Sequence, residues 1–345
     1  MGPVGGAFYR RRRGGQDAKQ ADAKPVDIVE CYKYRKGLKM NRGAMGIGIS
    51  IGVIVLLFVV MGFFVRESRA GWGGSPKELK PVSDEIAAKI EAAAPEKATA
   101  KPTKARKILV FWLCKDFYHE SIPVANKAIE IMGKKTGAYS VVFSDDMNMF
   151  DAKKLAEFDA ILFNNTTYLD FNEPGSRQAL MDFVNGGKGI IGLHAATDNF
   201  YTWPEAAAMI GGQYNEHPWT AGGVWAIKNY EPNHPLNASF KGEGFKVRDE
   251  IYRQKKFGEV ESRRILLTLD FNDPATKNVK GARESDIDMP VSWIKDYGKG
   301  RVFFCGLGHN NEIYYRPAIL QHELDGIQFA LGDLKVDATP VKEGK

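Results

Sequence analysis

The sequence predicts an α/β domain built on an open, mostly parallel sheet with an antiparallel extension. Short apolar runs alternate with amphipathic segments from residue 107 onward, an alternation typical of βαβ crossovers. The run GIIGL at residues 189–193 has no polar alternation, as expected of a strand buried on both faces of a parallel sheet. With 345 residues, 44% of them hydrophobic and 26% charged, the chain is long enough to bury a complete core.

The first half of the domain has a regular order of strands and helices. Strands are expected at residues 108–113, 140–143, 160–163 and 189–193. Between them, the helical spacing of apolar residues predicts helices at 122–135, 152–157 and 177–185. Gly186 and Gly187 close the last of these helices.

The second half is less regular, and its strands are expected to form the antiparallel extension. Further strands are predicted at 224–229, 249–253, 265–270, 290–295 and 301–305, the last two forming a hairpin. Helices are predicted at 203–210 and 317–331, the second of them amphipathic. With no internal repeat or break in the pattern, we expect one domain at 107–334 and a tail at 335–345.

The segment before the domain predicts export. Residues 1–45 are Gly-rich and basic, so we expect a disordered cytoplasmic leader. Residues 46–65 are uncharged and about long enough to span a bilayer, either as a transmembrane signal anchor or as a cleaved signal peptide. The basic excess ahead of them places the domain on the periplasmic or extracellular side, secreted if the leader is cleaved. Residues 66–106, rich in Ala, Lys, Glu and Pro, predict a flexible linker that contains a candidate short helix at 82–94.

Charge and cysteine content exclude some function classes. Much of the net charge of +6 lies in the first 45 residues, so no nucleic-acid partner is expected for the domain, and no nucleotide cofactor either. Cys31, Cys114 and Cys305 form no CxxC pair. Because Cys114 and Cys305 end apolar runs, we expect both to be small buried side chains.

Histidines recur where an apolar run gives way to a loop. His194 comes directly after the central strand, and ligands of open α/β sheets bind beyond the carboxyl ends of strands. A lone histidine there is more often satisfied by a backbone carbonyl, but four others occupy comparable positions: His119, His217, His234 and His309. His322, within the final helix, is expected to be structural. No HxH or HExxH spacing is present, so a metal site would have to assemble from distant segments.

One acidic pair adds a carboxylate to this set. In DEIY at 249–252, strand alternation would point Asp249 and Glu250 to opposite faces, and we expect Glu250 in the pocket and Asp249 at the surface. Aromatic residues are dense in the same segments, and a flat apolar face beside polar groups suits a sugar ring.

At these motifs the chain resembles the ThuA-like (trehalose utilisation) family, which has a flavodoxin-related, class I glutamine amidotransferase-like fold. The resemblance covers residues 107–334 and rests on FYHESIP, GLHAATD, GGQYNEHP, DEIY and YGKGRVFFCGLGH taken together. It implies a pocket formed by His119, His194, His217, Glu250 and His309, and a role in sugar metabolism, particularly of trehalose-type disaccharides and their 3-keto derivatives. Amidotransferase relatives carry a nucleophilic Cys where His194 stands, and imidazole cannot replace a thiolate there, so glutaminase activity is not expected.

Tyr118 and the pair Tyr314 and Tyr315 depart from the usual family form, in which Arg and Trp are common at these places. The departures bear on substrate fit more than on the chemistry.

The main hypothesis is an exported enzyme that acts on a sugar or keto-sugar. His194 and His309 would act as acid and base, with Glu250 as a second base or a ligand. His119 and His217 would orient the substrate or, with Glu250, hold a divalent ion such as Zn²⁺. Further substrate contacts are expected from residues of the same motifs: Asp198, Tyr214 and Asn310. Two alternatives remain, namely a carbohydrate-binding or sensing module without turnover and a purely structural network.

Overall fold

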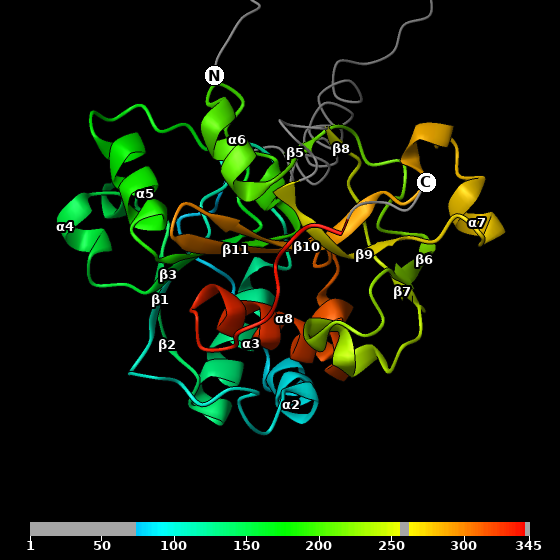
Figure 1. Ribbon diagram of the computed structural model, residues 1–345, viewed down its shortest axis with the longest axis horizontal. Helices are drawn as coiled ribbons and strands as arrows, with labels where there is room; N and C mark the ends of the chain where they lie inside the picture. The colour runs from blue at the N-terminus through cyan, green and yellow to red at the C-terminus, as the bar shows by residue number, and fades with distance from the viewer. Residues whose placement is uncertain (1–73, 256–261, 342–345) are drawn as a thin grey trace, which may run out of the picture. The chain divides into compact units, whose positions relative to one another are not determined.

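The computed structural model describes residues 74–255 and 262–341 and contains the expected open α/β sheet (Figure 1). Nine strands of the described chain form it, in the spatial order β2 (Ser140–Ser144), β1 (Lys107–Phe111), β3 (Ala160–Asn164), β4 (Gly189–Leu193), β11 (Gly300–Cys305), β10 (Pro290–Tyr297), β9 (Arg264–Leu269), β6 (Val224–Asn229) and β7 (Phe245–Arg248). Neighbours from β2 to β11 pair in parallel, and the remaining pairs are antiparallel. The predicted parallel sheet with an antiparallel extension is confirmed.

Helices cover both faces of the sheet (Figure 1). One face packs against α2 (Asp84–Ala93), α3 (Ile122–Thr136) and α8 (Pro317–Ala330), and the other against α4 (Ala152–Leu155), α5 (Ser176–Asn185) and α6 (Pro204–Ile210). In β1, Ile108 and Val110 pack on the α3 side, whereas Leu109 and Phe111 pack on the α5 side. Because side chains alternate along a strand, one continuous apolar run fills both halves of the core.

Shorter elements connect these layers. They are the strand pair β5 (Gln213–Tyr214) and β8 (Gln254–Lys255), helix α7 (Pro274–Lys277), and 3₁₀ helices at Met147–Met149, His194–Thr197, Pro235–Phe240, Glu284–Asp286 and Asn311–Tyr315. Cys114 and Cys305 are both buried, as expected, while Cys31 lies outside the described residues.

The carboxyl ends of the parallel strands meet at one edge of the sheet. The segment after β1 carries His119, the turn after β4 begins with His194, and the loop after β11 carries His309. Since β1, β3, β4 and β11 are adjacent and parallel, these loops emerge side by side.

The predicted strand at 249–253 is wrong. β7 ends at Arg248 and β8 begins at Gln254, and the residues between them form only an isolated bridge, between Ile251 and Trp219. Asp249, expected at the surface, is fully buried and accepts hydrogen bonds from the backbone of the loop after β11. The segment leaves the strand because its two carboxylates bind groups in other loops.

Part of the predicted linker also differs from expectation. Residues 84–93 form helix α2, capped by Ser83 and packed with a fully buried Ile90 against the α3 side of the sheet. Downstream, Gln328 of α8 accepts hydrogen bonds from the backbone N–H groups of Thr99 and Ala100, at 2.9 and 3.1 Å. The prolines that suggested a tether flank the helix without interrupting it. The described part of this segment is therefore packed onto the domain.

The predicted membrane-spanning segment at 46–65, like the leader before it, lies outside the described residues. Within residues 74–255 and 262–341, no helix is both long and apolar enough to cross a bilayer.

Helix α8 carries a buried acid that makes stability depend on pH. Glu323 is fully buried, and neither of its carboxylate oxygens makes a hydrogen bond within the described chain. Burial, with a smaller effect from Asp249, raises the pKa of Glu323 from 4.5 to about 8. Between these values the folded chain keeps a proton that the unfolded chain releases, so the stability present below pH 4.5 is lost as the pH rises toward 8.

Replacing Glu323 with Gln should remove this loss. We expect the free energy of unfolding of Glu323→Gln, relative to that of wild type, to rise by roughly 3–5 kcal/mol between about pH 4.5 and about pH 8. Thermal unfolding at the two pH values measures this difference. Any fixed effect of the amide cancels when the two pH values are compared. A difference between variant and wild type that stays constant over this range would contradict the assignment.

Candidate functional site

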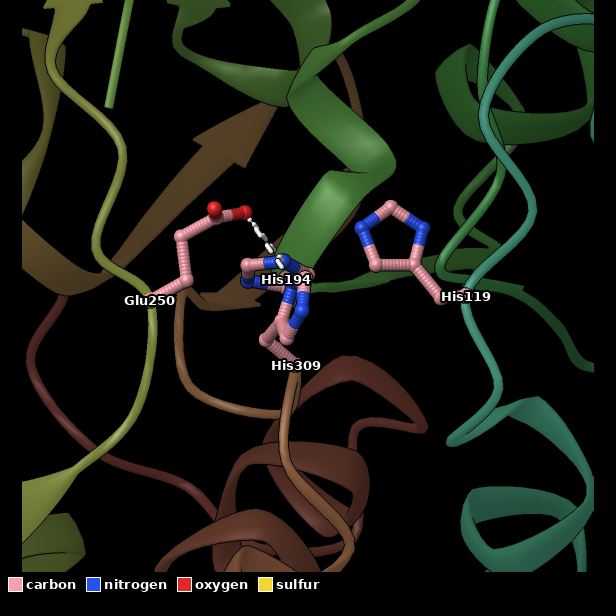
Figure 2. Close-up of side chains that lie close together, drawn as sticks. All are labelled: His119, His194, Glu250 and His309. Carbon is pink, nitrogen blue, oxygen red and sulfur yellow. Dashed lines mark ion pairs between the residues drawn. The ribbon is translucent and has the colours of Figure 1, made fainter. Parts of the chain in front are cut away.

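Four side chains from distant parts of the sequence converge at the carboxyl edge of the sheet (Figure 2). They are His119, His194, Glu250 and His309, and each offers an atom that lies within 4.8 Å of the corresponding atoms of the others. We call this set the His/Glu cluster. His119, His194 and Glu250 are buried, and the side chain of His309 is 20% exposed.

The turn after β4 fixes the ring of His194. Its φ is +43°, a left-handed conformation that bulky residues rarely adopt, and it turns the chain from the strand into the following 3₁₀ helix. His194 Nδ1 lies 3.0 Å from the carbonyl oxygen of Gly306, so we assign the ring proton to Nδ1. The other ring nitrogen, Nε2, faces Glu250 Oε2 at 3.5 Å.

A buried carboxylate holds the backbone on both sides of His309. Asp249 Oδ2 accepts from the N–H of Gly308 at 2.7 Å, and Oδ1 accepts from the N–H of Asn310 at 2.8 Å. Gly308 has a φ of +133°, which a residue with a side chain would rarely adopt. This arrangement places His309 Nδ1 3.0 Å from Glu250 Oε2.

His119 completes the cluster from the segment just before α3. Its ring centroid lies 4.9 Å from that of His194 and 5.1 Å from that of His309. Nε2 lies 3.4 Å from the hydroxyl of Tyr252, which leaves Nδ1 without a hydrogen bond. Burial, reinforced by the neighbouring imidazoles, lowers the pKa of His119 well below its usual value, so this ring is neutral near pH 7.

Glu250 is the common partner of three imidazoles. Its Oε2 faces His194 and His309, and its Oε1 lies 2.9 Å from Nδ1 of His217. Burial acts to raise the pKa of Glu250, but the imidazoles of His194, His217 and His309 outweigh it and hold the pKa well below the usual range. The carboxylate is therefore ionised near pH 7.

The donor set fits a divalent metal ion. His194 Nε2 and His309 Nδ1 both face Glu250 and are buried ring nitrogens that make no hydrogen bond of good geometry, while His119 turns its Nε2 toward them (Figure 2). Unsatisfied buried nitrogens are costly in an apolar setting, and imidazoles with one carboxylate are ligands that Zn²⁺ accepts. A histidine that binds a metal ion usually donates its other ring N–H to a carbonyl or carboxylate, which orients the ring. The hydrogen bond of His194 Nδ1 to the carbonyl oxygen of Gly306 is a contact of this kind.

The cluster differs from the predicted metal set. His217 is not among the four convergent groups, and its side chain is 44% exposed beside Glu250. The hydrogen bond with Glu250 raises the pKa of His217, which favours its protonated form. His194 and His309, predicted as acid and base, instead face the other cluster members.

A second layer of residues lies next to the cluster. The ring of Tyr252 is 4.6 Å from those of His194 and Tyr214. The carboxylate of Asp198, 6% exposed, accepts a hydrogen bond from the hydroxyl of Tyr201. Burial, partly offset by this bond, raises the pKa of Asp198 to about 7. The predicted substrate residues Asp198 and Tyr214 therefore lie near the cluster.

The remaining predicted residues have structural contacts. The amide nitrogen of Asn310 donates to the carbonyl oxygens of Ala221 and Arg248 and so braces the loop. His234 caps a 3₁₀ helix and lies 3.2 Å from the carbonyl oxygen of Asp337. The ring of His322 is hydrogen-bonded to Ser292 and to the carbonyl of Leu236, and it is structural as expected.

Sequence reasoning missed the roles of Asp249, Tyr252 and Tyr201. Asp249 and Tyr252 lie on either side of Glu250 and Ile251 in one short segment. Because this segment is not a strand, its consecutive side chains need not alternate between two faces and can reach the same site. Tyr201 stands three residues after Asp198, and nothing in the spacing distinguishes it from a packing aromatic.

Comparisons with known proteins match this architecture. A family model described as ThuA, trehalose utilisation, matches residues 107–330. A ThuA-like protein from Bacteroides uniformis aligns with a TM-score of 0.53 and 19% identity, covering 67% of this chain and 94% of its own. One from Parabacteroides merdae gives 0.51 and 20%, covering 68% and 93%. At such identities these two structures establish the fold alone. No curated protein matches the sequence.

Proposed function

Because the chain belongs to the ThuA (trehalose utilisation) family, we propose that it acts on a sugar or keto-sugar at the His/Glu cluster. The observation that carries this proposal is the convergence of three imidazoles and one ionised carboxylate, whose ligand atoms all lie within 4.8 Å of one another. We propose that His119, His194, His309 and Glu250 hold a divalent metal ion such as Zn²⁺. A bound ion of this kind would polarise a carbonyl oxygen of the substrate.

The acid and base are proposed to be the titratable groups beside the cluster. Asp198, with a pKa of about 7, is suited to take a proton through Oδ2, the oxygen that does not bond Tyr201. His217, with a raised pKa, is suited to donate one from Nε2, the ring nitrogen that does not face Glu250. Two groups with pKa values displaced toward neutrality fit a reaction that moves protons near pH 7.

For a 3-keto-glycoside the proposed reaction is an elimination. Asp198 takes the hydrogen from the carbon beside the carbonyl, and the electron pair moves onto the carbonyl oxygen. Its return expels the glycosidic oxygen from the adjacent carbon, and His217 protonates that oxygen. The rings of Tyr214 and Tyr252 lie 6.0 and 6.2 Å from the ring of His217.

We also propose, from the sequence before residue 74, that the domain is exported and held at the membrane by residues 46–65 or secreted after their cleavage.

Exchange of substrate hydrogen with solvent tests the enzyme proposal. Zinc-loaded protein is incubated with 3-ketotrehalose in D₂O, and NMR follows deuterium uptake beside the carbonyl while mass spectrometry follows released glucose. We expect wild type to show both deuterium uptake and glucose release. The rates of both should fall by at least about 100-fold in His217→Ala and His194→Ala. His234→Gln removes a histidine outside the cluster and serves as the matched control.

Variants that exchange and release at the wild-type rate would overturn the assignment. Binding of 3-ketotrehalose by calorimetry without exchange or release would instead favour the carbohydrate-binding module.

A further inference from the structure

Two tyrosines form an exposed aromatic surface beyond Asp198. Tyr168 and Tyr201 are 45% and 36% exposed, and their ring centroids lie 4.8 Å apart. Among the exposed large hydrophobic side chains of the described chain, only these two have rings in contact with each other. We call this pair, with Asp198, the tyrosine rim.

Hydrogen bonds join the two loops that carry the rim. The N–H of Tyr168 donates to the carbonyl of Asp198 at 2.7 Å, and the N–H of Leu169 donates to Asn199 Oδ1 at 2.9 Å. The amide of Asn199 in turn donates to the carbonyl and hydroxyl of Thr166. The relative position of the two rings is therefore fixed by the backbone.

The backbone at the rim is strained. Tyr168 has a φ of +51° and Phe200 a φ of +61°, and bulky residues rarely adopt such values. Strain of this kind is kept where surrounding contacts hold it, and it gathers at functional sites. Here Tyr168 is exposed, whereas Phe200 packs inward next to the exposed Tyr201.

The rim is continuous with the His/Glu cluster. The ring of Tyr252 contacts the rings of His194 and Tyr214, and the charge of Asp198 acts on both tyrosines. Asp198, which accepts a hydrogen bond from Tyr201, ends the 3₁₀ helix that begins with His194, so one short turn joins the rim to the cluster. A ligand at the cluster therefore has the rim as its outward neighbour.

We infer that the tyrosine rim is a subsite for a second sugar ring, linked to the ring that reacts at the His/Glu cluster. Tyrosine offers an apolar face for the C–H side of a pyranose, and its hydroxyl at the edge of the ring can bind a sugar hydroxyl. This inference rests on the proposed function and adds that Tyr168 and Tyr201 hold the second ring.

The test compares ligands with one and two rings. Calorimetry measures the affinity of zinc-loaded protein for methyl 3-keto-α-glucoside and for 3-ketotrehalose. We expect wild type to prefer the two-ring ligand by about five- to tenfold. Tyr168→Asn removes the ring but tolerates the left-handed backbone, and Tyr201→Ala removes the second ring. Each should bring the preference close to one.

Phe143→Ala is the matched control, because Phe143 is an exposed aromatic of β2, separated from β4 by β1 and β3. It should keep the wild-type preference. Equal affinity of wild type for both ligands, or an unchanged preference in both tyrosine variants, overturns the subsite alone. If neither ligand binds to wild type, the proposed function fails as well.

Discussion

Glu250→Gln is expected to lower zinc affinity by at least about 100-fold and to stop keto-sugar turnover. Glu250 is the carboxylate that three imidazoles face, and its negative charge offsets the positive charge of an ion held by neutral histidines. The amide keeps the shape but supplies no charge, and its N–H₂ is a donor that cannot bind a metal ion. Competition with a chromogenic chelator measures the affinity.

The matched control is Glu120→Gln, which neutralises an exposed acid that comes directly after His119 and pairs with Lys80. It should bind zinc as wild type does. Wild-type affinity in Glu250→Gln would show that the carboxylate is not a ligand, and the metal proposal would then fail.

Asp249→Asn is expected to weaken both the fold and the metal site. Both carboxylate oxygens accept backbone N–H groups next to His309, and an amide has only one acceptor oxygen. One buried N–H would then face an N–H₂ group, at a cost of about 2–4 kcal/mol in the free energy of unfolding. Burial raises the pKa of Asp249 to about 6, so the carboxylate is mostly ionised at pH 7 and its loss is felt there.

Chemical denaturation and chelator competition measure the two effects. Asp273→Asn, at the start of α7, changes a helix cap and an ion pair with Lys246, and it serves as control for a loss of stability that leaves zinc affinity unaltered. A fall in stability with unchanged zinc affinity would mean that Asp249 supports the fold but does not orient His309.

The sequence predicted the layers well because periodicity is local. Residues 189–193 are apolar throughout, and the strand is buried on both faces. The strand predicted at 249–253 was wrong because the conformation of this segment is not set locally. It depends on partners near residues 194, 217 and 308, which the alternation of side chains cannot reveal. The packing of α2 was missed because its contacts, with α3 and with the 3₁₀ helix at Asn311–Tyr315, are tertiary and leave no local pattern in the sequence.

The sequence predicted which residues form the site better than it predicted the role of each residue. Strand ends identified His119, His194 and His309, because parallel strands bring their carboxyl ends together. Which nitrogen faces the centre depends on contacts such as that between His194 Nδ1 and Gly306, which only three-dimensional coordinates reveal. The separation of His217 from the cluster likewise comes from its loop and not from its spacing.

The place of β11 in the sheet has a consequence for biosynthesis. This strand lies between β4 and β10, although it is made after every other strand of the sheet. A nascent chain thus keeps the two halves of its sheet apart until β11 inserts between them. His309 lies just beyond the end of that strand, so the His/Glu cluster is completed late, when nearly all of the domain has left the ribosome.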